Sequence, residues 1–220
     1  MSVIVQVSEL NFLNEDGLKV LDDIHLRVDR GELVFITGPA AAGKSVLMGL
    51  LATHVAPQRG QILVHGRNIA RMSRKKAYDL RQRIGYLPRG FTPLSRTPME
   101  NLMFKLRALG YIREAAEEKS LIALEQVGLS SRLSSLPESL EPADWVRVGV
   151  ALLLCTDPVL LLLDEPFADL DPEGTTEICE LLSRLRKRDL TTVLATRELP
   201  PMHEDSYRLV RLVDGRIVSS

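Results

Sequence analysis

Short apolar or alternating segments dominate the first third of the chain and predict β-strands there. The strand candidates are the alternating segments Val3–Val7 and Ile24–Val28, the apolar run Leu33–Thr37, and Ile62–Val64 ahead of a turn at His65-Gly66. A helix is predicted over Lys44–Thr53 and is expected to end before Pro57.

The middle third changes to the spacing of amphipathic helices. A basic amphipathic stretch first leads into a short strand, and three helices are then predicted, the first two ended by Gly110 and Gly128. In chain order these segments are Ser73–Arg83, the strand Ile84–Leu87, and the helices Pro98–Leu109, Ala115–Val127 and Pro142–Cys155.

Strands and helices alternate again in the last third. Val159–Leu163 is apolar throughout, as in a strand buried on both faces of a parallel sheet. Asp171 is expected to cap a helix that starts at Pro172 and runs to about residue 188. A strand over Thr192–Ala195 and a hairpin closed at Asp214-Gly215 follow. The order predicts an α/β fold with a β-rich front and a helical lobe inserted mid-chain.

Composition limits the classes of protein that this chain can belong to. Its 220 residues are 45% hydrophobic and 26% charged, which fits one large domain or a domain with a lobe. The 28 basic and 29 acidic residues leave a net charge of −1, which argues against a generally basic nucleic-acid binder. The same balance excludes an acidic, disordered chain.

The cysteines and apolar runs bear on location. Two cysteines, Cys155 and Cys179, are too few for a disulfide framework and favour a reducing compartment. The N-terminal segment lacks the basic region of a signal peptide. The most apolar region, Val146–Leu163, is interrupted by Gly, Thr, Asp and Pro and is not expected to span a membrane. Any membrane role is therefore expected to come through a partner.

One glycine-rich segment points to phosphate binding. It follows the Leu33–Thr37 strand, opens a helix and fits the pattern G-x-x-x-x-G-K-[ST]. Backbone N–H groups in such a loop converge on phosphate oxygens, Lys44 adds a cation, and the Ser45 hydroxyl can ligate Mg²⁺. A chance turn is the weaker alternative. The residues assigned to the nucleotide here are Gly38, Pro39, Ala40, Ala41, Ala42, Gly43, Lys44, Ser45 and Val46.

Two carboxylates at the end of a buried strand support that assignment. Asp164 and Glu165 directly follow Leu160–Leu163. Next to a phosphate loop, Asp164 is placed to hold Mg²⁺ and Glu165 to polarise an attacking water. Taken alone, the pair reads equally well as two solvated acids.

With these motifs the chain resembles the ATP-binding-cassette (ABC) family, specifically a stand-alone ATPase subunit of an ABC transporter, over nearly its whole length. The matching segments are Val20–Ile24 before the phosphate loop, Arg83–Tyr86 before the glutamine loop, Leu160–Pro166 as Walker B with the catalytic glutamate, and Ala168–Asp171 as the D-loop. Within the family, the Met72-Ser73-Arg74 stretch and Asp164-Glu165-Pro166-Phe167 are most similar to compact cassettes of lipid-trafficking, lipoprotein-release and cell-division complexes.

The resemblance implies a P-loop NTPase fold with an ABC-type parallel-sheet core, an N-terminal antiparallel β-subdomain and an inserted helical subdomain. Residues 1–220 then form a single ABC ATPase domain, with 1–88 and 156–220 as the ATP-binding core and 89–155 as the helical subdomain. It also implies ATP and Mg²⁺ as cofactors. Phe12 or Leu13 lies where the family often stacks an aromatic on adenine, and Phe12 could do so, although an apolar residue beside a strand is more often part of the core.

The implied setting is a complex on the inner face of the cell membrane. A cytoplasmic, peripheral subunit would dimerise around ATP and pass closure to transmembrane permease-type subunits through the region Arg89–Leu109. The second ABC subunit is either an identical copy or a different cassette, and contact with the membrane is indirect. No nucleic-acid partner is expected. Soluble ABC proteins that act on DNA or ribosomes usually carry two cassettes or long insertions, and this sequence has neither.

Three functional positions depart from the family pattern. Arg89 stands at the glutamine of the glutamine loop, Leu140–Asp144 at LSGGQ, and Arg197 at the switch histidine. Ala41 also replaces a usual glycine. In the family, LSGGQ of one cassette closes over ATP on the other, and here Glu141 brings a carboxylate while Pro142 has no N–H to donate. Like charges about 4 Å apart repel by roughly 4 kcal/mol at an effective dielectric of about 20.

Arginine at positions 89 and 197 stays charged at any relevant pH, so it cannot switch protonation state, but it binds phosphate well. In a homodimer, Glu141 of one copy is hypothesised to pair with Arg197 of the other. In a heterodimer, the partner would supply an intact LSGGQ. Trp145, beside the altered LSGGQ segment, is an interface residue or simply buried.

Two functions follow. The first is a slowly hydrolysing ATP-binding subunit of an ABC-type membrane transport or envelope complex. The second is a catalytically impaired nucleotide-binding subunit that supports a partner ATPase or a membrane assembly. Retention of Lys44, Asp164 and Glu165 favours weak but real turnover.

Overall fold

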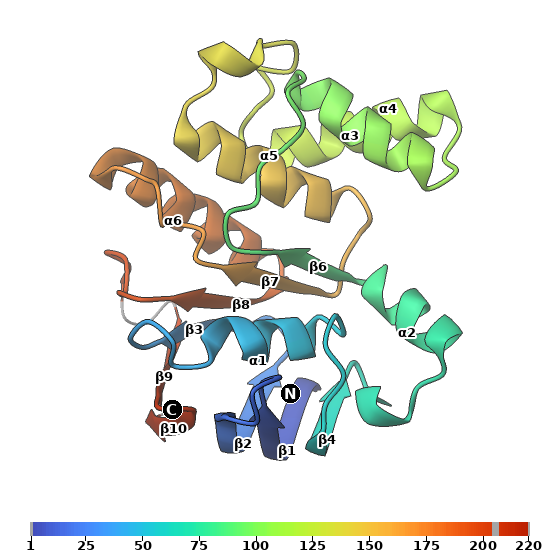
Figure 1. The fold of residues 1–220 in the computed structure, drawn as a ribbon. Coiled ribbons are helices and arrows are strands. Elements are labelled where there is room, and N and C mark those ends of the chain that lie inside the picture. Colours follow the sequence, from blue (N-terminus) through green and yellow to red (C-terminus); the bar gives the residue numbers. More distant parts are fainter. Residues whose placement is uncertain (1, 204–206, 220) are drawn as a thin grey trace.

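A computed structural model describes residues 2–203 and 207–219. The chain folds into two β-sheets with helices packed on them (Figure 1). The larger sheet has the strand order β10-β9-β3-β8-β7-β6 and the smaller one β2-β1-β4-β5. Neighbours in the larger sheet are parallel except β10, which pairs antiparallel with β9. The expected α/β fold with a parallel-sheet core is confirmed.

The larger sheet separates two apolar cores, and its strands alternate between them. Leu160 and Leu162 of β7 pack into one core, while Leu161 and Leu163 pack into the other. Burial of both faces explains why this strand is an unbroken run of leucines. The strands are β3 (Leu33–Thr37), β6 (Ile84–Leu87), β7 (Leu160–Asp164), β8 (Thr191–Thr196), β9 (Arg208–Val213) and β10 (Arg216–Ser219).

The smaller sheet extends beyond the predicted segments. It contains β1 (Val3–Leu13), β2 (Lys19–Asp29), β4 (Arg59–Val64) and β5 (Arg67–Asn68). Register shifts interrupt the β1–β2 pairing between Val7 and Leu13, and Glu9 and Asp23 have positive φ angles of 52° and 53°. Such bulges break the two-residue period, so alternation revealed only the regular parts of both strands.

The helices begin close to where the sequence predicts. Asp171 accepts a hydrogen bond from the Gly174 N–H at 2.7 Å and caps α6, which starts at Pro172, as expected. The first helix ends at Leu51 rather than Thr53, which has a left-handed φ of 60°. The α-helices are α1 (Lys44–Leu51), α2 (Arg74–Arg81), α3 (Pro98–Ala108), α4 (Arg113–Gln126), α5 (Pro142–Leu154) and α6 (Pro172–Lys187). Two short 3₁₀ helices cover Ile69–Arg71 and Pro137–Ser139.

The helices cover the larger sheet on both faces. Helix α1 lies between this sheet and the smaller one, while α5 and α6 lie on the opposite face (Figure 1). Helices α3, α4 and α5 come between β6 and β7 in the chain, within the segment 89–155 assigned above to a helical subdomain. Among the helices of the described residues, none has both the length and the apolar character needed to cross a membrane.

Candidate functional site

The loop between β3 and α1 packs closely against distant strands at its two glycine ends. A Cβ atom on Gly38 would lie 1.9 Å from the Leu212 carbonyl oxygen, and one on Gly43 would lie 2.8 Å from the Val20 carbonyl oxygen. Gly43 also has a φ of 100°, which other residues rarely adopt. Ala41, however, holds a left-handed φ of 61° without being glycine. Glycine is therefore required at positions 38 and 43 by contact with distant strands.

The C-terminal hairpin of β9 and β10 packs against this loop. In the turn between β9 and β10, Asp214 and Gly215 have φ angles of 47° and 74°, which agrees with the two-residue hairpin turn predicted from the sequence. The Gly215 N–H then donates to the Ala42 carbonyl at 3.2 Å, and the Gly215 carbonyl accepts from the Asp22 N–H at 2.8 Å. The phosphate loop thus rests on a segment far along the chain.

Lys44 points back into its own loop. Its ammonium donates to the carbonyl oxygens of Gly38 at 2.7 Å and Pro39 at 3.0 Å, and the residue is only 6% exposed. The same ammonium lies 3.6 Å from Oε1 of Glu165. A cation that is already desolvated and surrounded by oxygen atoms needs little reorganisation to exchange them for phosphate oxygens.

Asp164 ends β7 beside Ser45 and is 2% exposed. Burial raises the pKa of this carboxyl above its ordinary value, while the Ser45 hydroxyl and the charges of Lys44 and Arg89 oppose the rise. Among the described residues its Oδ1 atom has no hydrogen-bond partner, although it is buried. A buried, unsatisfied carboxylate oxygen next to a hydroxyl fits a hard cation such as Mg²⁺.

Glu165 is held at both carboxylate oxygens. Oε2 accepts from the Arg197 backbone N–H at 3.2 Å, and Oε1 faces the Lys44 ammonium. The residue has a φ of 52°, and its own N–H donates to the Ala195 carbonyl of β8 at 2.8 Å. A left-handed backbone at a non-glycine residue is costly and tends to be kept where it aims a functional group. Here it turns the carboxylate toward the phosphate loop.

Parallel strands bring these groups to one edge of the sheet. Glu165 follows β7, Arg197 follows β8 and Arg89 lies just past β6, so the two arginines flank the end of β7. All three side chains line a cavity of about 270 Å³ with the loop residues; we call it the phosphate-loop cavity. Its other lining residues are Val20, Ala40, Ala41, Ala42, Gly43, Lys44, Ser45 and Val46.

The start of α5 is built differently from a phosphate-binding helix end. Pro142 offers no N–H, and the buried carboxylate of Asp144 already accepts from the Glu141 N–H at 3.2 Å. Asp144 is also paired with Arg132 at 2.6 Å and Arg147 at 3.4 Å. The exposed Glu141 lines an acidic cavity with Asp169, Asp171, Glu173 and Glu177. Carboxylates therefore occupy the positive end of this helix.

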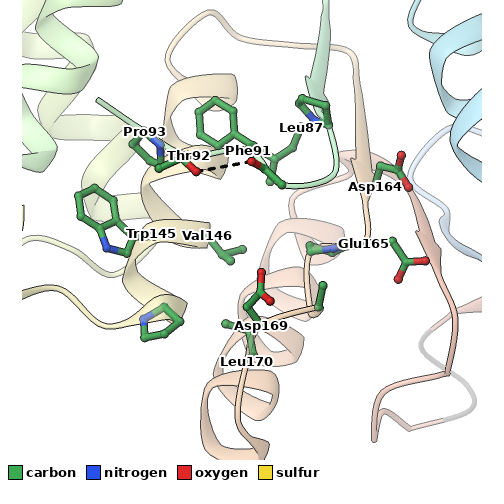
Figure 2. Close-up of a pocket in the computed structure, with 15 residues that line it drawn as sticks. Leu87, Phe91, Thr92, Pro93, Trp145, Val146, Asp164, Glu165, Asp169 and Leu170 are labelled. Carbon is green, nitrogen blue, oxygen red and sulfur yellow. Dashed lines mark hydrogen bonds between the residues drawn. The ribbon is translucent and has the colours of Figure 1, made fainter. Parts of the chain in front are cut away.

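A third cavity of about 240 Å³ lies between the start of α5 and the carboxylates of the site. Figure 2 shows Trp145 and Pro93 on one side of it, and Asp164 and Glu165 on the other with their carboxylates turned away from Trp145. Trp145 is half-buried rather than fully covered, so both predicted roles for it stay open.

Comparison with known proteins identifies the family. A family model described as ABC transporter matches residues 21–168, which include the phosphate loop and both carboxylates. The chain belongs to the ABC transporter family. The curated relatives that the chain matches are named ATP-binding proteins.

Two curated relatives illustrate the breadth of this family. The chain is 34% identical over 218 residues to the methionine import ATP-binding protein MetN of Carboxydothermus hydrogenoformans, covering 98% of this chain and 65% of that protein. It is also 34% identical over 199 residues to the cell division ATP-binding protein FtsE of Mycobacterium tuberculosis, covering 90% of this chain and 86% of that one. The chain thus spans just under two thirds of the MetN protein.

Solved ABC structures share the fold. The protein cbiO1 from Clostridium perfringens, part of the ABC transporter complex cbiONQ, superposes with a TM-score of 0.90 at 28% identity, over 100% of this chain and 88% of that one. The ATP-binding cassette MJ0796, in a dimeric structure bound to ADP and Pi, gives a TM-score of 0.82 at 23% identity, over 98% and 97%. The predicted P-loop NTPase fold of ABC type is confirmed.

Most residues assigned from the sequence meet in the phosphate-loop cavity or next to it. Gly38 and Pro39 hold Lys44 from behind, and Asp164 lies beside Ser45. Phe12 is half-buried in β1 and packs against the core, and it is not among the cavity-lining residues. Its stacking on adenine stays a prediction. Val20 lines the cavity and was not assigned, since only contacts between the two sheets bring β2 to the loop.

Proposed function

We propose that this chain is the ATP-binding subunit of an ABC-type membrane transport or envelope complex, and that it hydrolyses ATP slowly. The single observation that carries the proposal is the convergence of the phosphate loop, the buried Lys44 ammonium and the Glu165 carboxylate in one cavity. A cation and a carboxylate placed around a phosphate loop can hold a triphosphate and orient water against it.

Each of these side chains has a defined task in that reaction. Lys44 exchanges the Gly38 and Pro39 carbonyl oxygens for phosphate oxygens, and loop N–H groups hold the remaining ones. Ser45 and Asp164 would hold Mg²⁺, which supplies positive charge to the phosphate tail when bound. Glu165, released by Lys44 but still bound to the Arg197 N–H, accepts a hydrogen bond from the water that attacks the terminal phosphate.

Slow turnover is proposed because two positions carry fixed charges. Arg89 and Arg197 cannot donate or accept a proton during the reaction, and both side chains stay cationic throughout. The Lys44–Glu165 pair adds a contact that must open before the carboxylate is available. Among the described residues that line the cavity, Glu165 is then the one that can accept a proton, and hydrolysis depends on it.

The same arginines, with Pro142 at the start of α5, favour one alternative: a subunit that binds ATP without useful hydrolysis and supports a partner ATPase or assembly. Steady-state phosphate release with Mg-ATP separates the two functions. For the ATPase we expect release by the natural chain and none by Glu165→Gln or Lys44→Ala. Equal release by the natural chain and Glu165→Gln, with ATP still bound, supports the alternative.

The proposed partners are transmembrane permease-type subunits, with the chain at the cytoplasmic face of the membrane. Two findings support this setting: the described helices include no membrane span, and the relatives are named for import and cell division. Purification of the tagged chain from gently solubilised membranes, followed by mass spectrometry, is expected to recover an integral membrane protein. Recovery of ribosomal proteins or nucleic acid instead contradicts the assignment.

The second cassette is either an identical copy or a different chain. Opposite charges favour the copy, because Glu141 lies in an acidic cavity and Arg197 in the cationic phosphate-loop cavity. Sedimentation of Glu141→Arg, Arg197→Glu and the double variant tests the hypothesised pair. We expect each single variant to weaken self-association and the double variant to restore it. A double variant no better than the singles excludes the pair and favours a heterodimer.

A further inference from the structure

One stretch of the chain concentrates positive charge outside the nucleotide site. Residues 65–83, which we call the basic segment, hold seven Lys or Arg residues and one acidic residue, although the whole chain has a net charge of −1. The segment includes the turn after β4, strand β5, a 3₁₀ helix and α2, at one side of the molecule (Figure 1). Its basic residues are Arg67, Arg71, Arg74, Lys75, Lys76, Arg81 and Arg83.

Neighbouring carboxylates do not neutralise these cations. Of the Lys and Arg side chains that the structure describes in the segment, all are exposed and none forms an ion pair with another described residue. Arg81 donates from Nε to the Thr53 hydroxyl at 3.1 Å, which fixes its guanidinium at the surface. By contrast, arginines at positions 132, 147, 208 and 216 are paired with carboxylates. The segment therefore presents an uncompensated positive potential.

Three arginines from separate parts of the chain come together around His65. They are Arg30 before β3, Arg67 in β5 and Arg83 before β6. His65 and Arg30 both donate through their backbone N–H groups to the chain around the start of β1, at 2.7 and 2.9 Å. The pKa of His65 lies below its ordinary value, first because of burial and then because of the charges of these three arginines. Long-range pairing thus gathers guanidinium groups that a phosphate group can bridge.

This cluster lies at the opposite edge of the larger sheet from the phosphate loop. Arg30 and Arg83 precede β3 and β6, whereas the phosphate loop follows β3 and Arg89 follows β6. Strand β3 has five residues at about 3.3 Å each, so the two edges are on the order of 16 Å apart. Substitutions in the cluster should therefore leave nucleotide binding unchanged.

We propose that the basic segment, together with Arg30, docks on a membrane surface of anionic phospholipid, whose phosphate groups the arginines around His65 hold. Helix α2 is about 12 Å long and carries Lys75 and Lys76, so the cations extend beyond the size of one phosphate ion. Tyr78 on the same helix is 55% exposed, and amphipathic rings of this kind are enriched at headgroup depth. The inference rests on the proposed membrane setting and adds a direct contact with lipid.

Co-sedimentation of the full chain with lipid vesicles tests this contact. We expect binding to vesicles that contain phosphatidylglycerol, loss of binding to pure phosphatidylcholine, and weakening by added salt. The double variants Arg67→Gln/Arg83→Gln and Lys75→Gln/Lys76→Gln should each bind the anionic vesicles about 25-fold more weakly, because one cation near such a surface contributes about fivefold.

A matched control removes the same charge elsewhere. Arg113→Gln/Arg184→Gln, at exposed arginines of α4 and α6 without an ion pair among the described residues, should retain the vesicle affinity of the natural chain. Unchanged thermal unfolding midpoints show that the variants are folded. An equal loss in this control overturns the proposal, because the attraction would then depend on net charge alone.

Two further probes identify other ligands. Tighter binding to a short DNA duplex than to anionic vesicles overturns the lipid contact in favour of nucleic acid. Binding of inorganic phosphate that depends on Arg67 and Arg83, without vesicle binding, overturns it in favour of a free anion. If the folded natural chain binds Mg-ATP but no vesicles, the lipid contact fails and the proposed function stands. Absence of ATP binding by a chain that binds vesicles has the opposite meaning.

Discussion

The Lys44 ammonium and the Glu165 carboxylate lie 3.6 Å apart, and their side chains are 6% and 9% exposed. The loop's cation and the candidate catalytic base therefore hold each other while no phosphate is bound. A buried pair of this kind keeps either charge from being left uncompensated. Triphosphate binding must separate them, because phosphate oxygens and Glu165 compete for the same ammonium.

Replacement of Glu165 by glutamine removes that competition. Glu165→Gln is expected to bind ATP about tenfold more tightly than the natural chain, since one negative charge near the phosphates is lost. Fluorescent-nucleotide titration measures the affinity. Glu180→Gln, on the exposed face of α6, is the matched control and should leave the affinity unchanged. Weaker binding by Glu165→Gln than by this control contradicts the competition.

Asp164 provides a test that depends on pH. Because burial raises its folded-state pKa above the unfolded value, the ionised carboxylate costs stability, and the cost disappears as pH falls through the folded pKa. In Mg²⁺-free buffer at neutral pH, Asp164→Asn is expected to be more stable by about 1 kcal/mol, a Tm increase of roughly 2–4 °C.

The advantage of Asp164→Asn should shrink on acidification, as the natural side chain takes up its proton. The variant should also lose the dependence of ATP binding on Mg²⁺, whereas Asp169→Asn, in the adjacent loop, keeps it. Thermal melts across the acidic range and calorimetry with and without Mg²⁺ provide the readouts. If Asp164→Asn is less stable than the natural chain at neutral pH, and the difference grows in acid, the assigned burial cost is contradicted.

Positions 41 and 43 of the phosphate loop are expected to respond in opposite directions. Ala41 holds a left-handed φ, so Ala41→Gly relieves strain of about 1 kcal/mol and should raise the midpoint of urea unfolding. Gly43→Ala places a Cβ atom 2.8 Å from both the Val20 carbonyl oxygen and a Leu21 methyl, and should destabilise by about 1–3 kcal/mol. A stabilising Gly43→Ala substitution would show that the loop does not pack against β2 as described.

Cysteine reactivity tests the burial of Cys155 and Cys179. Burial raises the pKa of Cys179 to about 11, so on the order of one thiol in a thousand is ionised at pH 8. Burial raises the pKa of Cys155 as well. Neither thiol should react with iodoacetamide at pH 8 in the folded chain, and both should react in denaturant, as mass spectrometry can follow. Rapid alkylation of Cys179 without denaturant would place α6 farther from the sheet.

The sequence predicted elements whose information is local. The Leu33–Thr37 strand, the phosphate loop and the helix at Lys44 follow one another without interruption, so residue type and spacing defined them together. The ends of β1 and β2 were missed, because bulges around Glu9 and Asp23 remove the alternation.

Local sequence patterns also could not predict the contacts that depend on the order of the strands in a sheet. Lys44 and Glu165 meet although β8 lies between β3 and β7, and that order cannot be derived from periodicity. Val20 and Gly215 likewise reach the loop through contacts between segments far apart in the sequence. By contrast, the departures at Arg89 and Arg197 were visible as residue types, and the structure adds that both line one cavity.

The hydrogen bond from the Gly215 N–H to the Ala42 carbonyl joins the phosphate loop to a hairpin far along the chain. The outer strand of the same hairpin carries the exposed Val218, so we expect a change in the loop, when Lys44 releases its carbonyl partners, to reach that strand. A spin label at that position would therefore sense ligand occupancy without touching the chemistry.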